Sequence, residues 1–244
     1  ISLIKRGDNG GYFEIKPLVE SFEVDNTADR FIATENIQGV NALTFEDQTY
    51  VGGEVSYGFK NKDNKAFPTY GFDTEITAGY KTIVNGGNSD NKFGYVESHI
   101  AFDHKLSKSG TLVFATKLGG EAILGDNFEF FHGASLGGNH SLRGFRNERF
   151  IGKYAFYQNT DLRLKLGKFK SSFIPLNYGL TGGFDYGRVW EGNDSANLNN
   201  ESNTINTSAG GSFWISGLET FTANVGYYGS NDGGRIVFVL GFAF

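Results

Sequence analysis

The sequence contains no cysteine, no methionine and only three prolines, and it has no long apolar run. Without cysteine, neither a disulfide framework nor a thiolate metal site can form. No stretch approaches the roughly 18 apolar residues of a membrane-spanning helix. A membrane protein built from strands remains open, because barrel strands alternate and average out as polar. From the absence of methionine we expect a processed chain or a fragment, with no signal peptide left to read.

Glycine and aromatic residues are abundant instead, with 35 Gly, 24 Phe and 12 Tyr among 244 residues. This composition suits pleated strands, tight turns and the aromatic girdles of a membrane interface. The length allows one large all-β domain or two small ones. The net charge of -5, with lysines and arginines scattered along the chain, argues against a nucleic-acid partner.

The last ten residues, 235–244, alternate between large apolar side chains and small or polar ones. A period of two indicates a strand with two different faces. In a soluble sandwich the large face would meet a second sheet, whereas in an outer-membrane barrel it would meet lipid. The residues of the large face are Ile236, Phe238, Leu240, Phe242 and Phe244.

Ten segments share this alternation, and each holds about the 9–11 residues that a tilted strand needs to cross a bilayer. No segment shows helical periodicity. We therefore predict an all-β, antiparallel transmembrane β-barrel with about ten strands in this chain. The predicted strands are 11–24, 49–60, 68–84, 93–106, 111–123, 153–166, 176–190, 205–215, 220–228 and 235–244.

The connections between these strands alternate in length. With the C-terminus in the periplasm, the mostly longer connections lie outside the cell, at 25–48, 85–92, 125–152, 191–204 and 229–234. The short connections lie in the periplasm, at 61–67, 107–110, 167–175 and 216–219. Outer-membrane barrels show this asymmetry. Charges of both signs on the polar faces predict a lumen with ion pairs; the alternative is the solvated face of a soluble sheet.

One long connection is unusual in composition. Residues 133–152 combine Arg143 with Leu142, Phe145 and Phe150, a set of apolar side chains that a purely solvated loop rarely contains. Glycines at positions 137, 138 and 144 allow tight backbone turns. We predict that this loop folds back into the barrel and presents Arg143 to an inward-facing carboxylate.

Here the residues resemble a known family. Ser141-Leu142-Arg143-Gly144-Phe145 resembles the Val/Leu-Arg-Gly-Phe/Tyr signature of the bacterial surface antigen superfamily, outer-membrane barrels of the BamA, TamA and two-partner-secretion type. Residues 157–164 are similar to its next strand, with Asp161 before Leu-Arg. Gly183-Phe184-Asp185-Tyr186-Gly187 resembles its Phe-x-Asp-x-Gly motif, with Gly183 in place of Phe. Phe242-Ala243-Phe244 resembles the terminal recognition signal of outer-membrane proteins, although Val239 stands where a glycine is expected.

The resemblance implies that Arg143 lies inside the barrel near Asp185 and Asp161 and fixes the loop there. The alternative is an ordinary surface arginine, but Asp185 falls on the inward face independently of the resemblance. Family barrels have sixteen strands, so these ten would be the last ten, or the chain is a smaller relative. We expect residues 1–244 to form a single transmembrane domain, with N-terminal periplasmic domains absent.

The resemblance further implies insertion, assembly or translocation of proteins at a Gram-negative outer membrane, through a seam between the first and last strands. The alternatives are an anchor or export barrel for an absent N-terminal lipase or phosphoesterase, and a simple diffusion pore. Expected partners are the lipid bilayer, client outer-membrane or secreted proteins, and periplasmic domains or accessory lipoproteins.

We expect no enzyme activity, cofactor or metal. The histidines at 99, 104, 132 and 140 show no metal-ligand spacing. His99 shares the inward parity of Asp103, so a hydrolase with a Ser-His-Asp set is conceivable, but an ion pair in the lumen is the favoured interpretation.

Overall fold

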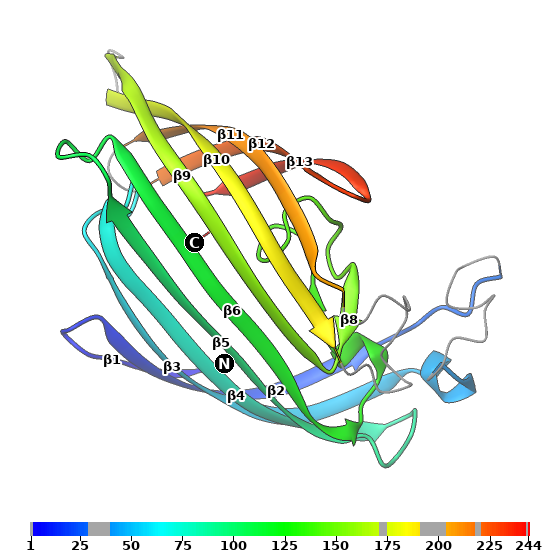
Figure 1. Cartoon of the computed structure of the whole chain (residues 1–244). Helices are drawn as coiled ribbons and strands as arrows, with labels where there is room; N and C mark the ends of the chain where they lie inside the picture. Colours follow the sequence, from blue (N-terminus) through cyan, green and yellow to red (C-terminus); the bar gives the residue numbers. More distant parts are fainter. Residues whose placement is uncertain (1, 29–39, 171–174, 191–203, 218–220, 243) are drawn as a thin grey trace.

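The computed structural model describes residues 2–28, 40–170, 175–190, 204–217, 221–242 and 244. Eleven antiparallel strands form one sheet, which curves around an interior in Figure 1. They are β1 (Leu3–Arg6), β2 (Gly11–Phe22), β3 (Gln48–Lys62), β4 (Tyr70–Asn85), β5 (Lys92–Lys105), β6 (Leu112–Asn127), β9 (Tyr154–Lys170), β10 (Pro175–Trp190), β11 (Asn206–Gly217), β12 (Phe221–Ser230) and β13 (Gly233–Leu240).

The strands of this sheet follow one another in chain order. The exception is an insertion between β6 and β9, which pair with each other at Thr116 and Thr160. The insertion contains η2 (Phe130–His132) and a two-stranded sheet of β7 (Ala134–Leu136) and β8 (Phe150–Gly152). A further short helix, η1 (Ala42–Phe45), precedes β3.

All ten predicted strands are present, and the antiparallel all-β prediction is confirmed. The predicted number was one short, because β1 has four residues, too few to show an alternation. Within the described part of the chain, β1 pairs only with β2 and β13 only with β12. The sheet therefore begins and ends in edge strands.

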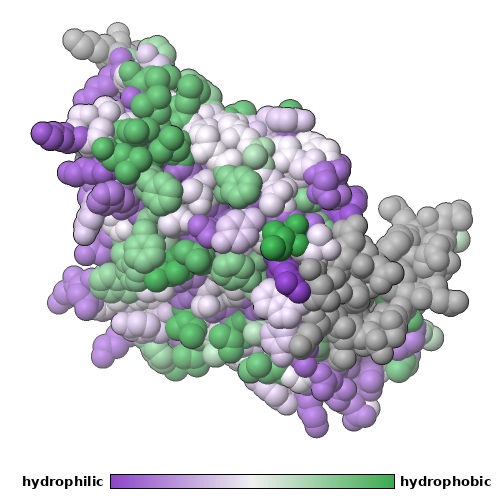
Figure 2. Space-filling model, in the orientation of Figure 1, coloured by the Kyte–Doolittle hydropathy of each residue, from purple (hydrophilic) through white to green (hydrophobic). Residues whose placement is uncertain are grey.

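Large apolar side chains cover the outer face of the sheet. Figure 2 shows them among residues of intermediate hydropathy over the middle of this face, with hydrophilic residues mostly toward its rim. Ile236 is 78% exposed and Leu240 77% exposed. In water such a surface would be unfavourable, whereas in lipid it is the ordinary outer band of a barrel. Other exposed members are Val55, Tyr57, Ile76, Tyr80, Phe102, Leu162, Leu164, Leu166, Leu180, Phe213 and Phe238.

The inner face carries charges of both signs, as the sequence predicted. They pair across strands as Lys16–Glu54, Lys60–Asp73 and Lys81–Glu20. His99 also lies there, but its Nε2 is 3.6 Å from Asp73 Oδ1. The predicted grouping of His99 with Asp103 is therefore wrong, because Asp103 is bound by Lys62 and Arg163 instead.

The last strand is shorter than predicted. β13 ends at Leu240, and Gly241 has a φ of +101°, a conformation that L side chains rarely adopt. This bend breaks the alternation, so Phe242 does not continue the outward face of Phe238 and Leu240. It packs instead against the buried Trp214. The prediction of a continuous outward face up to Phe244 is wrong for this reason.

Several predicted connections lie partly outside the described residues. These are the outer connections 25–48 and 191–204 and the inner connections 167–175 and 216–219. In the described segments there is no helix with the length and apolar character needed to span a membrane.

Candidate functional site

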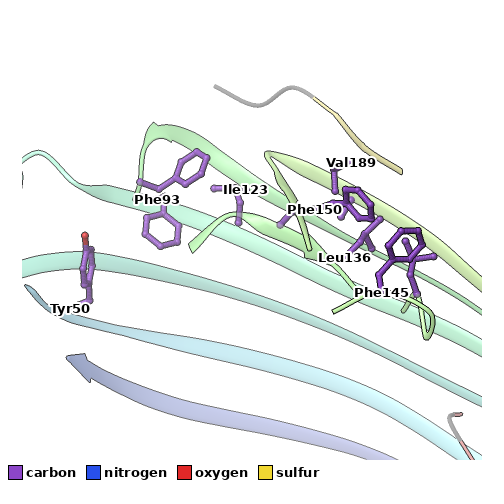
Figure 3. Packing of buried hydrophobic residues seen from close by; sticks show 11 residues of the cluster. Tyr50, Phe93, Ile123, Leu136, Phe145, Phe150 and Val189 are labelled. Atoms are coloured by element: carbon purple, nitrogen blue, oxygen red, sulfur yellow. The ribbon is translucent and has the colours of Figure 1, made fainter. Parts of the chain in front are cut away.

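The insertion between β6 and β9 forms the centre of an apolar core. Leu136, Leu142, Phe145 and Phe150 are at most 1% exposed. Figure 3 shows Leu136, Phe145 and Phe150 of the loop lying together beside Val189 of β10. The prediction that this loop folds back and packs is confirmed. The strand and loop residues of the same cluster are Tyr50, Phe93, Ile123, Phe128, Ala134, Ala155 and Val189.

Two kinds of glycine shape the loop. Gly137 and Gly138 have φ values of +129° and +81° and turn the chain after β7. Gly144 serves a different purpose, because a Cβ there would lie 2.7 Å from Ser208 Cβ and 2.8 Å from Gly229 O. The absence of a side chain lets the backbone beside Arg143 approach β11 and β12.

Arg143 points from this loop into a cluster of carboxylates. Its Nε lies 3.0 Å from both carboxylate oxygens of Asp185, and its Nη2 also donates to Asp185. Its backbone N–H donates to Asp185 Oδ2 at 3.0 Å. Nη1 donates to Asp161 Oδ1 and to the hydroxyl of Tyr228, both at 2.8 Å. Every nitrogen of this guanidinium has a partner, an arrangement that its planar fork favours.

The strand register explains why Asp185 is ready to receive this arginine. Asp185 on β10 stands opposite Asn159 on β9 and Ser208 on β11. Residues opposite each other in a sheet project from the same face. Asn159 Nδ2 and Ser208 Oγ each donate to Asp185 at 2.8 Å. The carboxylate is therefore held on three sides by hydrogen-bond donors, and it is fully buried.

Tyr228 completes the enclosure. The guanidinium carbon of Arg143 lies 4.2 Å from the centroid of the Tyr228 ring, within the range of a cation–π interaction. Gly183 leaves room for both groups, since a Cβ there would lie 2.6 Å from Arg143 Nη2 and 2.7 Å from the Tyr228 hydroxyl. The departure from the family's phenylalanine at position 183 therefore coincides with this close approach. We call Arg143, Asp161, Asp185 and Tyr228 the loop lock.

The lock belongs to a longer row of charges. Asp161 also lies 3.5 Å from Nη2 of Arg163, which donates through Nη1 to Asp103 at 2.8 Å. Lys62 Nζ is 2.9 Å from the other oxygen of Asp103. Three cations and three carboxylates thus alternate across the interior, in the order Asp185, Arg143, Asp161, Arg163, Asp103 and Lys62. The sequence analysis predicted that Arg143 lies near Asp185 and Asp161, but it did not extend the row to Arg163, Asp103 and Lys62.

The remaining predicted site residues separate into two groups. Phe184 is 49% exposed and belongs to the outer face, as expected for a neighbour of the inward Asp185. Gly187 lies beneath the loop, where a Cβ would be 3.0 Å from Leu136 Cδ1. Phe242 and Phe244 contact Arg163 inside the barrel: its guanidinium carbon is 4.3 Å and 5.0 Å from their ring centroids.

Two loop side chains have shifted proton affinities. Burial alone lowers the pKa of Arg143, but Asp161 and Asp185 outweigh it and raise that pKa above its ordinary value. Arg143 therefore stays charged. Burial lowers the pKa of His132 to about 3, with Lys81 adding to the effect. His132 is thus neutral near pH 7 and packs against the rings of Phe22, Tyr50, Phe93 and Phe131.

This arrangement fastens one part of the protein to another. A buried ion pair is strongly destabilised when one partner is lost, because the other charge remains in a low-dielectric site. In the described ranges no group of three or more His, Asp or Glu side chains could hold a metal ion. The arrangement is a set of charge-assisted hydrogen bonds that holds the loop against the inner face of the sheet.

A family model described as haemolysin secretion/activation protein ShlB/FhaC/HecB matches residues 40–213. The chain belongs to this family. The match includes three members of the loop lock, Arg143, Asp161 and Asp185, whereas Tyr228 lies beyond the matched range. The resemblance to the bacterial surface antigen superfamily is therefore confirmed.

Among solved structures, the chain is similar to BamA from Haemophilus ducreyi lacking POTRA domains 1-3. The TM-score is 0.66 at 16% sequence identity, and the match covers 98% of this chain and 53% of that chain. At this identity the likeness shows the barrel fold alone. None of the curated proteins matches the sequence.

Proposed function

We propose that residues 1–244 act as one integral outer-membrane barrel that inserts or translocates polypeptides, with the loop lock holding the resting state. The observation that carries this proposal is the buried Arg143, fixed by Asp185 and Asp161 inside a sheet whose outer face is apolar. Family membership supports a role in protein secretion or assembly. The partners would be the bilayer and a client polypeptide.

The edges of the sheet suggest where a client would bind. β1 and β13 each offer one side without a strand partner in the described part of the chain. An edge strand presents free backbone donors and acceptors, which can template an added strand. We propose that a client strand pairs at this seam. An anchor or export barrel for an N-terminal effector is the second candidate.

A filled interior argues against a simple diffusion pore. The loop contributes its own apolar cluster, and the lock ties that cluster to β9, β10 and β12. In planar bilayers we expect the wild type to show little steady conductance and Arg143→Ala to open more often. A large, steady conductance that Arg143→Ala leaves unchanged would contradict the locked lumen.

The first test is heat-modifiable gel mobility in detergent. A folded barrel should migrate as a compact band that shifts on boiling, and Arg143→Ala and Asp185→Ala should both weaken that band. Lys60→Ala is the control, because its pair with Asp73 is partly solvated and contributes little. An unboiled wild type without a compact band would refute a barrel of these residues.

The functional test uses lipid vesicles with and without the protein. A different outer-membrane barrel, unfolded in urea, is added, and its own heat-modifiable band reports how fast it folds. An assembly function predicts faster folding with the wild type than with empty vesicles. Equal rates would argue for the anchor or for secretion of a client that is not itself a barrel.

A further inference from the structure

The end of the chain turns into the interior of the sheet and meets Arg163, which neighbours Asp161 of the loop lock. After β13, the N–H of Gly241 still donates to Thr222 O of β12 at 2.7 Å. The positive φ of Gly241 then turns the chain inward. The ring of Phe242 comes to lie 5.6 Å from the ring of Trp214 and 5.8 Å from that of Phe67.

Phe67 comes from a distant part of the sheet. It sits in the turn 63–69 between β3 and β4, and its ring stacks on Trp214 of β11 at 4.9 Å. In the same turn, Ala66 O accepts a hydrogen bond from the Thr222 hydroxyl. β3 and β12 are the third and tenth of the eleven strands in sheet order. The turn therefore crosses the interior and reaches the last strands of the sheet.

The turn is built to hold this position. Asp63 Oδ1 accepts the backbone N–H groups of Thr69 and Tyr70, at 2.8 and 3.1 Å. Asn64 Oδ1 accepts those of Ala66 and Phe67, both at 2.9 Å. Side chains that bond the backbone in this way fix the shape of a turn. Phe67 is thus presented on a rigid support.

Arg163 joins the turn to the end of the chain. Its side chain is fully buried, and its Nη2 donates to Phe244 O at 3.1 Å. Its guanidinium lies over the rings of Phe242 and Phe244. Through Asp103 it also contacts Lys62 at the base of the turn. Arg163 therefore contacts both terminal phenylalanines and, through Asp103, is connected to the base of the turn.

We propose that Arg163, Phe67 and Trp214 form a second fastening, the terminal latch, which holds Phe242 and Phe244 inside the barrel. Arg163 is its positioning residue. Release of the latch would free the end of β13 for seam opening, and this functional consequence rests on the function proposed above. Two donors mark the latch as the weaker fastening: Arg163 Nε and Trp214 Nε1 have no hydrogen-bond acceptor among the described residues.

The absence of cysteine allows a direct test. Phe244→Cys introduces one thiol at the end of the chain, and a bulky polyethylene glycol maleimide reports its accessibility as a gel shift in detergent. The thiol should react slowly while the latch is closed. Arg163→Met should speed the reaction roughly tenfold or more, since a charged hydrogen bond and ring contacts are lost. Arg163→Lys should restore part of the protection by keeping the charge.

Arg163→Met should still fold, because Asp103 keeps Lys62 and Asp161 keeps Arg143. The heat-modifiable band checks this. Gly241→Val gives a second route that alters no charge, because valine disfavours the positive φ and so should straighten the end of β13. Lys60→Met is the control and should leave the labelling rate unchanged.

The possible results separate the latch from the proposed function. Faster labelling in Arg163→Met and Gly241→Val, with the compact band retained, supports the latch even if the vesicle assay shows no assembly activity. If Arg163→Met does not fold, the labelling rates of Gly241→Val and Arg163→Lys test the latch in its place. Labelling in folded variants that is as slow as in the wild-type background would overturn the latch.

Discussion

Two buried arginines fasten two segments of the chain inside the sheet, Arg143 the loop and Arg163 the terminal residues, and they differ in how completely their hydrogen bonds are satisfied. Arg143 binds Asp185 and Asp161 through all three side-chain nitrogens and its own backbone N–H. Arg163 binds Asp103 and Phe244 O, but its Nε has no acceptor within the described segments. Trp214, which packs against Phe242 as Arg163 does, also has an Nε1 without an acceptor among the described residues.

The difference indicates an order of release. A buried donor without an acceptor costs about 1–3 kcal/mol, so the closed state is less favourable at Arg163 than at Arg143. If the proposed functions hold, the terminal latch opens first and the loop lock second. The end of β13 would then become available to a client from the periplasmic side while the outer end stays closed.

The largest effect is expected at the lock. Asp185→Ala should lower the free energy of unfolding by about 3–5 kcal/mol, because it removes the carboxylate that binds Nε and Nη2 of the buried Arg143 and the acceptor of the Ser208 hydroxyl. Urea titration followed by the compact gel band measures this loss. Asp103→Ala should lower the free energy of unfolding by less, because Arg163 Nε and Trp214 Nε1 already lack acceptors among the described residues. Equal losses for the two variants would contradict the proposed difference between the loop lock and the terminal latch.

A smaller loss is expected from crowding the lock. Gly183→Ala would place a Cβ 2.6 Å from Arg143 Nη2, so the guanidinium must shift. Overpacking of this kind costs about 1–3 kcal/mol. The control is Gly182→Ala at the next position, where a Cβ meets no atom within 4 Å. The unfolding midpoints of the two variants should differ clearly, and similar values would show that the lock tolerates displacement.

Acid should loosen the loop through His132. Its pKa is about 3 in the folded protein and about 6.5 when exposed, so between these values the unfolded chain binds the extra proton. Stability should therefore fall as the pH drops below about 6.5, by at most about 2 kcal/mol at pH 5. Glu20, 3.9 Å away, moderates the effect. His132→Phe should flatten this part of the pH profile, and an unaltered slope would assign it to other groups.

The features predicted from sequence are those that follow from the alternation of large apolar residues with small or polar ones. Alternation gave ten strands and their outward faces, and the parity of Asp185 placed it inside before any resemblance was considered. The motif around Arg143 then predicted its partners. These inferences need only local pattern and one family signature, because neighbouring strands in this sheet follow chain order.

The features that were missed depend on contacts between distant segments. Nothing local relates Phe67 to Trp214 or to Phe242, because their meeting requires the turn 63–69 to cross the interior. The bend at Gly241 was hidden by an alternation that continues to Phe244 in the sequence. One signal was available: Asp103, Asp161 and Arg163 share the inward parity, and buried charges need partners.

The smallest predicted effect tests whether the loop lock and the terminal latch are energetically coupled. Asp161 is shared, lying 2.8 Å from Arg143 Nη1 and 3.5 Å from Arg163 Nη2. After Arg143→Met or Arg163→Met alone, Asp161 keeps one cation, but in the double variant it is buried without any. The double variant should therefore lose more stability than the two single losses combined, by about 0.5–1 kcal/mol. Arg143→Met with Lys60→Met should be additive, because these residues share no partner. Additivity in both pairs would mean that the lock and the latch act independently, so that opening one of them would not affect the stability of the other.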